Sequence, residues 1–252
     1  MQIKIGNSLF LGGASKYKIE APVSGLESPA IRTGSGLYAG RDGGFVSGHF
    51  YGHRTIVIKG FYIGEDCADA DELRQDLFGL LRIRYKLPIF IQTFSGDIYF
   101  TEGFVTDIKT DIESPVAGEY QVTLLCPDPI LYEAENMTSS ASTWKTKSIS
   151  ANTPTDVNNT GNVDILPYFT FSGATTNPTM TNNTTGETFS LNASIPAGLV
   201  VDMKKRLTLA DNTSYNEKRT TDSTWWALTP GINSITLSAA GVMSYQKGKA
   251  GI

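Results

Sequence analysis

The sequence predicts a mainly β protein with a single helix and two domains. Short runs rich in β-branched and aromatic residues, bounded by turn residues, recur along the whole chain. Only one segment repeats leucines at helical spacing. The composition also changes near residue 133, because Ser, Thr and Asn number 16 in residues 1–133 but 46 in residues 134–252. Such a change is typical of a boundary between domains.

The first domain is expected to be a β-rich α+β fold. Two segments with turn residues, Ser95-Gly96-Asp97 and the stretch from Ser114 to Gly118, separate apolar runs and therefore predict two hairpins. The runs around them are rich in Ile, Val, Phe, Tyr and Thr, which favour strands. The strands expected in this domain cover residues 54–61, 89–94, 98–100, 104–112 and 120–125.

One helix is predicted over residues 69–84. Asp69 can cap its first turn, and Glu72 stands three residues further on, as in a capping box. Leucines then recur on one face of the helix, which indicates packing against a sheet. The residues at helical spacing are Leu73, Leu77, Leu80, Leu81 and Arg84.

A glycine-rich stretch between residues 21 and 53 is too long for an ordinary loop of a compact domain. Two interpretations stay open. The stretch is either an irregular surface hairpin or an arm that becomes ordered by lying on another subunit. Its apolar residues would then be the oligomer-interface candidates, namely Leu37, Tyr38, Phe45, Phe50 and Tyr51.

The second domain reads as strands throughout, without a segment of helical period. Residues 165–173 alternate apolar and polar side chains, and residues 199–203, 206–209 and 233–237 are further short strands between turn signals. This spacing is typical of a β-sandwich. The segment Cys126-Pro127-Asp128-Pro129 cannot continue a strand ladder, so the predicted domains are residues 1–130 and 131–252.

The composition excludes several classes of protein. The chain of 252 residues carries 21 basic and 25 acidic side chains, so its net charge of −4 lacks the basic excess of a general nucleic-acid binder. No apolar run of transmembrane length and no signal peptide is expected, so no membrane insertion is predicted. Two cysteines, Cys67 and Cys126, exclude a disulfide scaffold and indicate a protein made in a cytoplasm.

No catalytic, cofactor or metal site is predicted. His49 and His53 have the spacing of helical metal ligands, but glycines and aromatic residues around them make a helix improbable, so surface or packing roles are favoured. Neither a phosphate-binding loop nor a nucleophile elbow is present. The protein is therefore expected not to be an enzyme.

Trp225 and Trp226 are weak candidates for sugar contacts, since an exposed aromatic ring can stack on a pyranose. The favoured alternative is that one of the two fills the sandwich core and the other covers an edge, because adjacent strand residues face opposite ways.

Several segments, in order along nearly the whole chain, resemble the distal tail proteins (Dit) of siphophages, the siphovirus-type tail component family. The similar segments are Arg41-Asp42-Gly43-Gly44, residues 51–60, the predicted helix with Leu87-Pro88-Ile89, Cys126-Pro127-Asp128-Pro129 with Tyr132, residues 159–169 and residues 226–236. The resemblance implies a ring-forming N-terminal domain, which assembles six-fold, and a galectin-like C-terminal β-sandwich. The residues after Glu133 leave no room for the large arm that some members insert there.

The function that the resemblance implies is a structural hub of the virion. Six copies close a ring that joins the tail tube protein to the tail-tip protein or baseplate, and DNA only passes through the lumen. The protein would be synthesised in the bacterial host cytoplasm, and a receptor-binding protein or cell-wall carbohydrate is a further partner to test. The alternatives are a carbohydrate-binding tail module that adheres to the host cell wall and a tail-associated cell-wall hydrolase.

Overall fold

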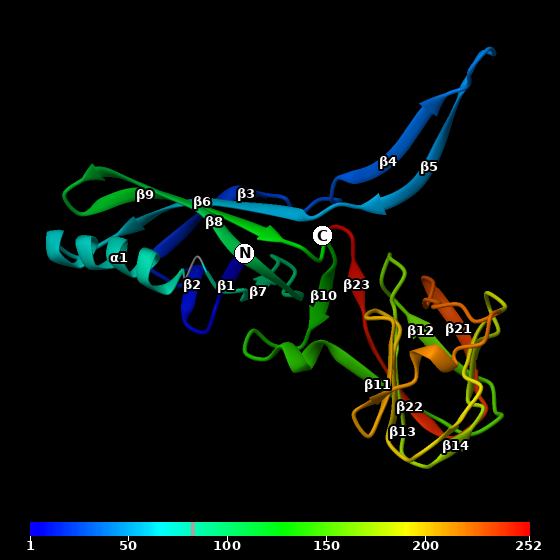
Figure 1. Ribbon diagram of the computed structural model, residues 1–252. Helices are drawn as coiled ribbons and strands as arrows, with labels where there is room; N and C mark the ends of the chain where they lie inside the picture. The colour runs from blue at the N-terminus through cyan, green and yellow to red at the C-terminus, as the bar shows by residue number, and fades with distance from the viewer. Residues whose placement is uncertain (82–83) are drawn as a thin grey trace. The chain divides into compact units, whose positions relative to one another are not determined.

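The structure, a computed structural model, describes residues 1–81 and 84–252 (Figure 1). Strands make up 54% of the chain and helix 8%, which confirms the mainly β prediction. The chain divides into two compact units. Unit 1 comprises Met1–Ser140 and Ala250–Ile252, and unit 2 comprises Ala141–Lys249.

Unit 1 is built on one antiparallel sheet with the strand order β2-β1-β7-β8-β9-β6-β3, and β10 pairs with β8. Ile3, Ile58, Leu77 and Val122, all fully buried, belong to its core. The strands of this sheet are β1 (Gln2–Ile5), β2 (Leu9–Gly12), β3 (Tyr17–Ser24), β6 (Arg54–Ile63), β7 (Leu87–Gln92), β8 (Ile98–Ser114), β9 (Ala117–Cys126) and β10 (Leu131–Ala134).

Strand β8 is one continuous strand of 17 residues, where the sequence predicted two separate strands. Its first part pairs with β7 and β10, and its second part pairs with β9. The register shifts between Val105 and Asp107, so the strand carries a bulge there. A bulge increases the local twist and bends a strand. This bend allows β8 to pass from one group of neighbours to the next without a turn.

The helix α1 (Cys67–Leu80) begins two residues earlier than predicted, and Asp66, not Asp69, is its N-cap. The Asp66 carboxylate accepts the Asp69 N–H at 2.8 Å. Leu73 and Leu77 are buried against the sheet as predicted. The last predicted turn partly falls on residues 82–83, which lie outside the described residues.

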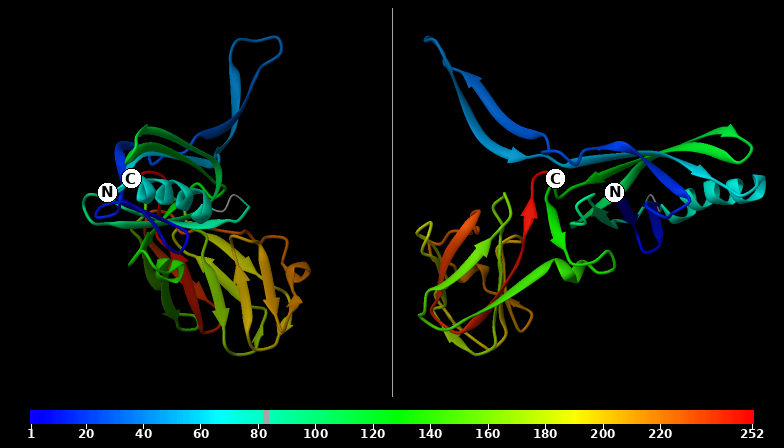
Figure 2. Two further views of the ribbon diagram at one scale, coloured as in Figure 1. Left: turned by 90° about the vertical axis from the view of Figure 1, so that its left-hand side faces the viewer. Right: turned by 180° about the vertical axis from the view of Figure 1, so that it is seen from behind.

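The glycine-rich stretch forms a two-stranded ribbon, here called the arm, from β4 (Ile31–Leu37) and β5 (Gly44–Tyr51), with one register shift between Thr33 and Gly34. The arm projects away from the rest of unit 1, as Figure 2 shows from two further directions. Neither of its strands pairs with any other described strand. The sheet continues immediately after it, because β6 starts at Arg54.

The chain leaves unit 1 later than the sequence predicted. The prolines after Cys126 do end β9, but the chain then forms β10, whose Tyr132 lies opposite Phe100 of β8. Strand β10 therefore belongs to the sheet of unit 1, and the division falls at Ser140 and not at residue 130. The composition changes before the architecture does because residues 135–140, Glu-Asn-Met-Thr-Ser-Ser, are already rich in Ser, Thr and Asn but still belong to unit 1.

Unit 2 contains a six-stranded sheet of order β11-β22-β13-β18-β19-β20, a four-stranded sheet of order β12-β21-β15-β16, and the short pair β14-β17. Its elements are η1 (Ser140–Thr143, which starts in unit 1), β11 (Trp144–Ile149), β12 (Thr155–Asn159), β13 (Tyr168–Phe171), β14 (Thr175–Thr176), β15 (Thr179–Asn182), β16 (Glu187–Ser190), β17 (Ser194–Ile195), β18 (Leu199–Asp202), β19 (Leu207–Ala210), β20 (Thr213–Ser214), η2 (Asn216–Lys218), β21 (Gly231–Leu237), β22 (Gly241–Gln246) and β23 (Gly248–Lys249).

The two larger sheets of unit 2 share one core, as a sandwich requires. Phe169 and Met243 from the six-stranded sheet and Met180 and Ile235 from the four-stranded sheet are all fully buried in it. Buried asparagines support the segment that closes the sandwich. Asn233, for example, donates to the carbonyls of Thr229 and Gly231, which satisfies its amide inside the core.

Candidate functional site

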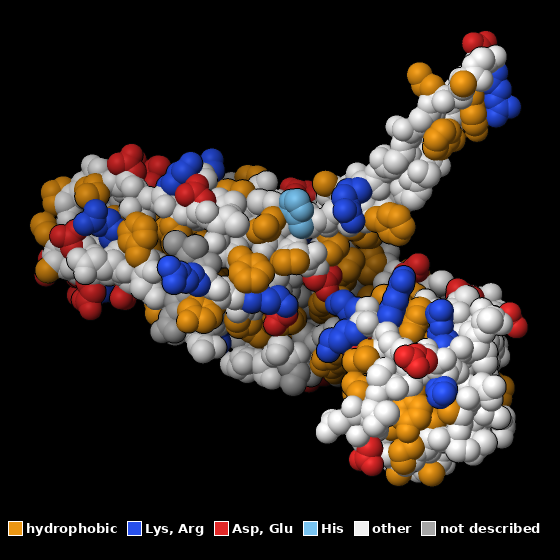
Figure 3. All heavy atoms as spheres, in the orientation of Figure 1, with side chains coloured by type: hydrophobic (Ala, Val, Ile, Leu, Met, Phe, Trp, Pro, Cys, Tyr) orange, Lys and Arg blue, Asp and Glu red, His pale blue; other side chains and the backbone are white. Residues whose placement is uncertain are grey.

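The arm exposes apolar side chains towards its tip and at its root, as the space-filling view shows (Figure 3). Leu37 is 88% exposed and Phe50 is 67% exposed, and Phe45 is close to half exposed. Clusters of exposed large apolar side chains of this kind mark interaction sites in soluble proteins. The arm is therefore the leading candidate for a functional surface.

One face of the arm is both cationic and aromatic. Arg32 lies opposite Phe50 in the ribbon, and Tyr38 contacts Phe45 with ring centroids 5.9 Å apart. The guanidinium of Arg41 stacks on Tyr38, 3.8 Å from the ring centroid. We call these five side chains the cationic–aromatic face. The sequence analysis did not select Arg32 or Arg41 as interface residues, because the register of the ribbon is needed to place them on the same face as the aromatic rings.

Two glycines make this face possible. A Cβ at Gly36 would lie 2.7 Å from the ring of Phe45, and one at Gly48 would lie 2.8 Å from the ring of Phe50. Each aromatic ring therefore covers a glycine of the ribbon. This arrangement explains why the stretch alternates glycines with aromatic residues, since any larger residue would displace the rings.

The five interface candidates from the sequence all lie on the arm, but they do not share one face. Tyr38, Phe45 and Phe50 belong to the cationic–aromatic face. Leu37 and Tyr51 lie on the other face, with two exposed side chains that the sequence did not select, Ile31 and Val46. Both faces of the ribbon are thus apolar.

A second feature open to association is the edge of β8. Beyond Gly103, β8 pairs with β9 on one side, and among the described residues no strand pairs with its other side. An unpaired strand edge presents N–H and C=O groups that can bond to a second chain.

The two tryptophans proposed as sugar contacts are both engaged within unit 2. Trp226 is 1% exposed, and its indole N–H donates to the Met180 carbonyl at 3.0 Å. Burial excludes it as a sugar contact. Trp225 is half-buried, with its ring 4.4 Å from that of Phe189 and the Arg219 guanidinium 5.9 Å from its centroid. The alternative, one ring in the core and the other at an edge, describes this arrangement.

Trp144 is an aromatic residue that the sequence analysis missed. It starts β11, is 42% exposed, and makes an edge-to-face contact with Tyr168 at 6.4 Å. The sequence did not indicate a binding residue here, because Trp144 is the single aromatic residue of a segment rich in Lys, Ser and Thr.

The described residues contain no group of three or more His, Cys, Asp or Glu side chains able to hold a metal ion. His53 is exposed, and the side chain of His49 lies outside the described ones. Burial raises the pKa of the Cys126 thiol to about 11, which keeps it protonated and unreactive. Among the described residues, no helix has both the length and the apolar character needed to span a membrane.

Comparison with known proteins agrees with the architecture of unit 2. Residues 160–248 match the family described as "Siphovirus-type tail component, C-terminal domain". These residues, all in unit 2, are similar to that domain. This match confirms the resemblance to siphophage distal tail proteins that the sequence segments indicated. No curated protein sequence matches the chain.

The fold of the chain is also similar to that of a solved phage protein. The crystal structure of the SPP1 Dit protein, described as a paradigm of the hub adsorption apparatus in phages that infect Gram-positive bacteria, aligns with a TM-score of 0.69 at 18% identity. The alignment covers 90% of this chain and 92% of that one, so both units take part. A chain from the activated baseplate of phage P2 with Ca aligns with a TM-score of 0.43 at 10% identity over 98% of each chain.

Proposed function

We propose that the chain is a structural hub protein of a siphophage virion, in which six copies close a ring between the tail tube and the tail tip or baseplate. In this role the protein acts by assembly and carries out no catalysis, so it needs no cofactor. The family match of unit 2 and the fold shared with SPP1 Dit support the proposal.

The exposed arm carries the proposal. Its apolar side chains are costly to leave in water, since burying one Val, Leu, Ile, Phe or Met side chain is worth roughly 1.5–3 kcal/mol. The arm is also only two strands wide, and an isolated hairpin is at best marginally stable in water. Both facts indicate that the arm lies on a protein surface in the assembled state. In a hexamer the same contact would occur six times.

The proposed partners follow from the hub role. One face of the ring would seat on the tail tube protein, and the other would receive the tail-tip protein. DNA would pass through the lumen without specific binding. The protein would be made in the host cytoplasm and function in the virion, and a receptor-binding protein is a further partner to test.

The test is the mass and shape of the purified protein. Light scattering should give six times the chain mass of 27.3 kDa, and negative-stain images should show rings with an open lumen. A protein that stays monomeric at high concentration in both measurements contradicts the hexameric ring.

A second candidate function is carbohydrate binding by unit 2, and the exposed Trp144 beside Tyr168 is the observation that favours it. An exposed aromatic face can cover a sugar ring. The full chain should then bind polysaccharide from host cell walls, and Trp144→Ala should abolish that binding while Trp225→Ala should not. Absence of binding by the unchanged chain excludes this function.

A further inference from the structure

The end of the sheet opposite the arm carries a second exposed surface. Strand β6, of ten residues, starts at Arg54, next to the root of the arm, and ends at Ile63. At about 3.3 Å per residue, these two ends lie roughly 30 Å apart. In Figure 1 the arm extends from one end of β6, and the far end of the sheet points in the opposite direction.

We call this second region the distal surface and define it by Phe61, Ile63, Asp111, Glu113 and Glu119. Phe61 and Ile63 alternate with buried residues on the outward face of β6 and are both exposed. In the register of the sheet, Glu119 lies between Phe61 on one side and Asp111 on the other. The distal surface is therefore apolar and acidic, and Lys18, which lies opposite Phe61 on β3, borders it on the side away from the carboxylates.

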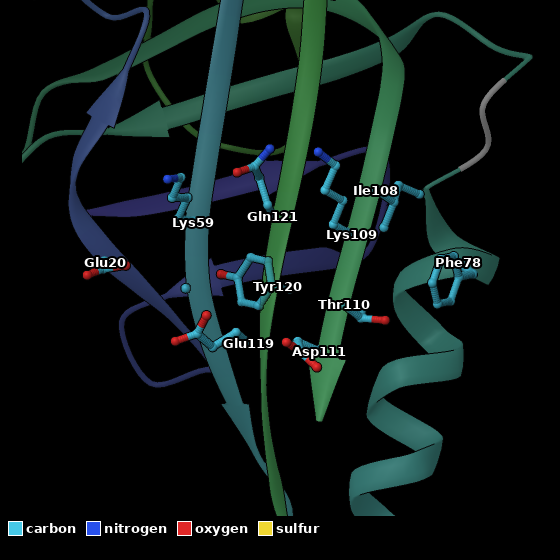
Figure 4. Close-up of a pocket in the computed structure, with 11 residues that line it drawn as sticks. Glu20, Lys59, Phe78, Ile108, Lys109, Thr110, Asp111, Glu119, Tyr120 and Gln121 are labelled. Atoms are coloured by element: carbon cyan, nitrogen blue, oxygen red, sulfur yellow. The ribbon is translucent and has the colours of Figure 1, made fainter. Parts of the chain in front are cut away.

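Figure 4 shows this arrangement, with Asp111 and Glu119 near the end of the sheet and Lys59, Gln121 and Lys109 in the next row. The acidic groups repel one another. Glu113 beside Glu119 raises the pKa of the Glu119 carboxyl, and Glu20 and Asp111 add to this effect. A cationic partner would relieve that repulsion.

The arm supplies the matching chemistry. Among residues 31–51 there are two arginines, Arg32 and Arg41, against one aspartate, Asp42. Both arginines lie on the face that also carries three aromatic rings. Guanidinium groups pair with carboxylates, and the rings can cover Phe61 and Ile63.

We propose that the cationic–aromatic face of one copy's arm docks on the distal surface of a second copy of this chain. The proposal rests on the proposed ring and names the surface that receives the arm. Because the two surfaces lie at opposite ends of β6, the arm of one copy cannot reach the distal surface of the same copy. The contact is head-to-tail, and such contacts close into rings when the rotation between copies permits.

Charge reversal tests the pairing directly. In the full-length protein, Glu113→Lys with Glu119→Lys places cations opposite the arm and should weaken self-association at least about 100-fold at low salt, measured by analytical ultracentrifugation. Arg32→Glu with Arg41→Glu should do the same. The protein with all four changes should recover most of the lost association, because the charges are exchanged. High salt should reduce these differences.

The control is an equal charge change elsewhere. Asp156→Lys with Asp164→Lys alters two exposed residues of unit 2 and should leave the association constant unchanged. Circular dichroism should show that every variant keeps its fold, since all of the substituted side chains lie at the surface.

Mixing separates a head-to-tail contact from other arrangements. A copy with a reversed arm and a copy with a reversed distal surface should each stay dissociated alone, because contacts between identical copies then pair like charges. In an equal mixture at low salt every contact between the two kinds of copy pairs opposite charges, so the mixture should recover assemblies in which the two kinds alternate. If the distal reversal leaves the hexamer intact while arm variants abolish it, the arm binds elsewhere and this proposal is wrong, although the ring stands. If the unchanged protein stays monomeric, the ring and this contact are both wrong.

Discussion

Arg54 Nε donates a hydrogen bond of 2.8 Å to the carbonyl of Pro129, joining the root of the arm to the segment that follows the last long strand of unit 1. The same guanidinium donates through Nη1 to the carbonyls of Gly25 and Glu27 at 2.6 and 2.7 Å, and through Nη2 to that of Ala250. Arg54 is 1% exposed. One side chain therefore holds together four segments that are distant in the sequence.

Arg54→Met should lower the free energy of unfolding by at least about 3 kcal/mol. The substitution keeps an unbranched chain but removes the donor from one buried carbonyl, that of Ala250, and from three part-buried ones. Each buried polar group left unsatisfied costs roughly 1–3 kcal/mol. Urea unfolding followed by circular dichroism measures the change. The control is Arg74→Met, which removes a partly exposed partner of Asp71 and should cost about 1 kcal/mol or less. Equal losses for the two variants would contradict the role assigned to Arg54.

Leu77→Ala should destabilise unit 1 by ~2–5 kcal/mol, the range for truncating a buried leucine. Leu77 is fully buried under the sheet, and α1 supplies few other buried side chains. The matched control on the same helix is Leu80→Ala, because Leu80 is exposed and should change stability by about 0.5 kcal/mol or less. Thermal unfolding of both variants compares them. A similar small effect at Leu77 would mean that the helix packs loosely.

Local patterns predicted most of the secondary structure. Leucine periodicity placed Leu73 and Leu77 on the buried face of α1, and the turn residues Ser95-Gly96-Asp97 placed the hairpin between β7 and β8. The helix start was wrong because two aspartates, Asp66 and Asp69, both have the chemistry of a cap. Only the backbone geometry decides between them, and Asp66 is the extended residue that accepts the Asp69 N–H.

The candidate surfaces were harder to predict because they depend on register and distance. The sequence left open whether the glycine-rich stretch is an irregular surface hairpin or an arm, and it did not show that Phe45 and Phe50 cover glycines on one face. Glu113 and Glu119 look like ordinary surface acids in the sequence. They meet only because β8 and β9 form a hairpin, and β6 then places Phe61 beside them. The burial of Arg54 and its contacts could not be predicted, since the sequence of a strand does not distinguish a buried arginine from an exposed one.

The two cysteines should differ sharply in reactivity. Cys67 is exposed, whereas burial of Cys126 raises its thiol pKa to about 11, so at pH 8 Cys126 remains a protonated thiol. The thiolate is the reactive form. A thiol reagent at pH 8 should therefore label one cysteine of the native protein and both after denaturation, counted by mass spectrometry. Rapid labelling of Cys126 in the native protein would show that the core around β9 opens readily.

The arm should be required for assembly but not for folding. Replacing residues 36–50 with a short Gly-Ser linker removes most of both apolar faces, so light scattering should show loss of the hexamer. Each unit should keep its fold, because neither arm strand pairs with any other described strand. The matched point variants are Phe50→Ser, which should weaken the hexamer, and Thr33→Ser, a polar change on the same ribbon that should not. If the hexamer stays intact without the arm, the contacts that close the ring must instead be made by the open edge of β8 and the neighbouring helix. A variant that fails to fold, seen as loss of the circular dichroism of the parent, would instead show that the arm stabilises unit 1 itself.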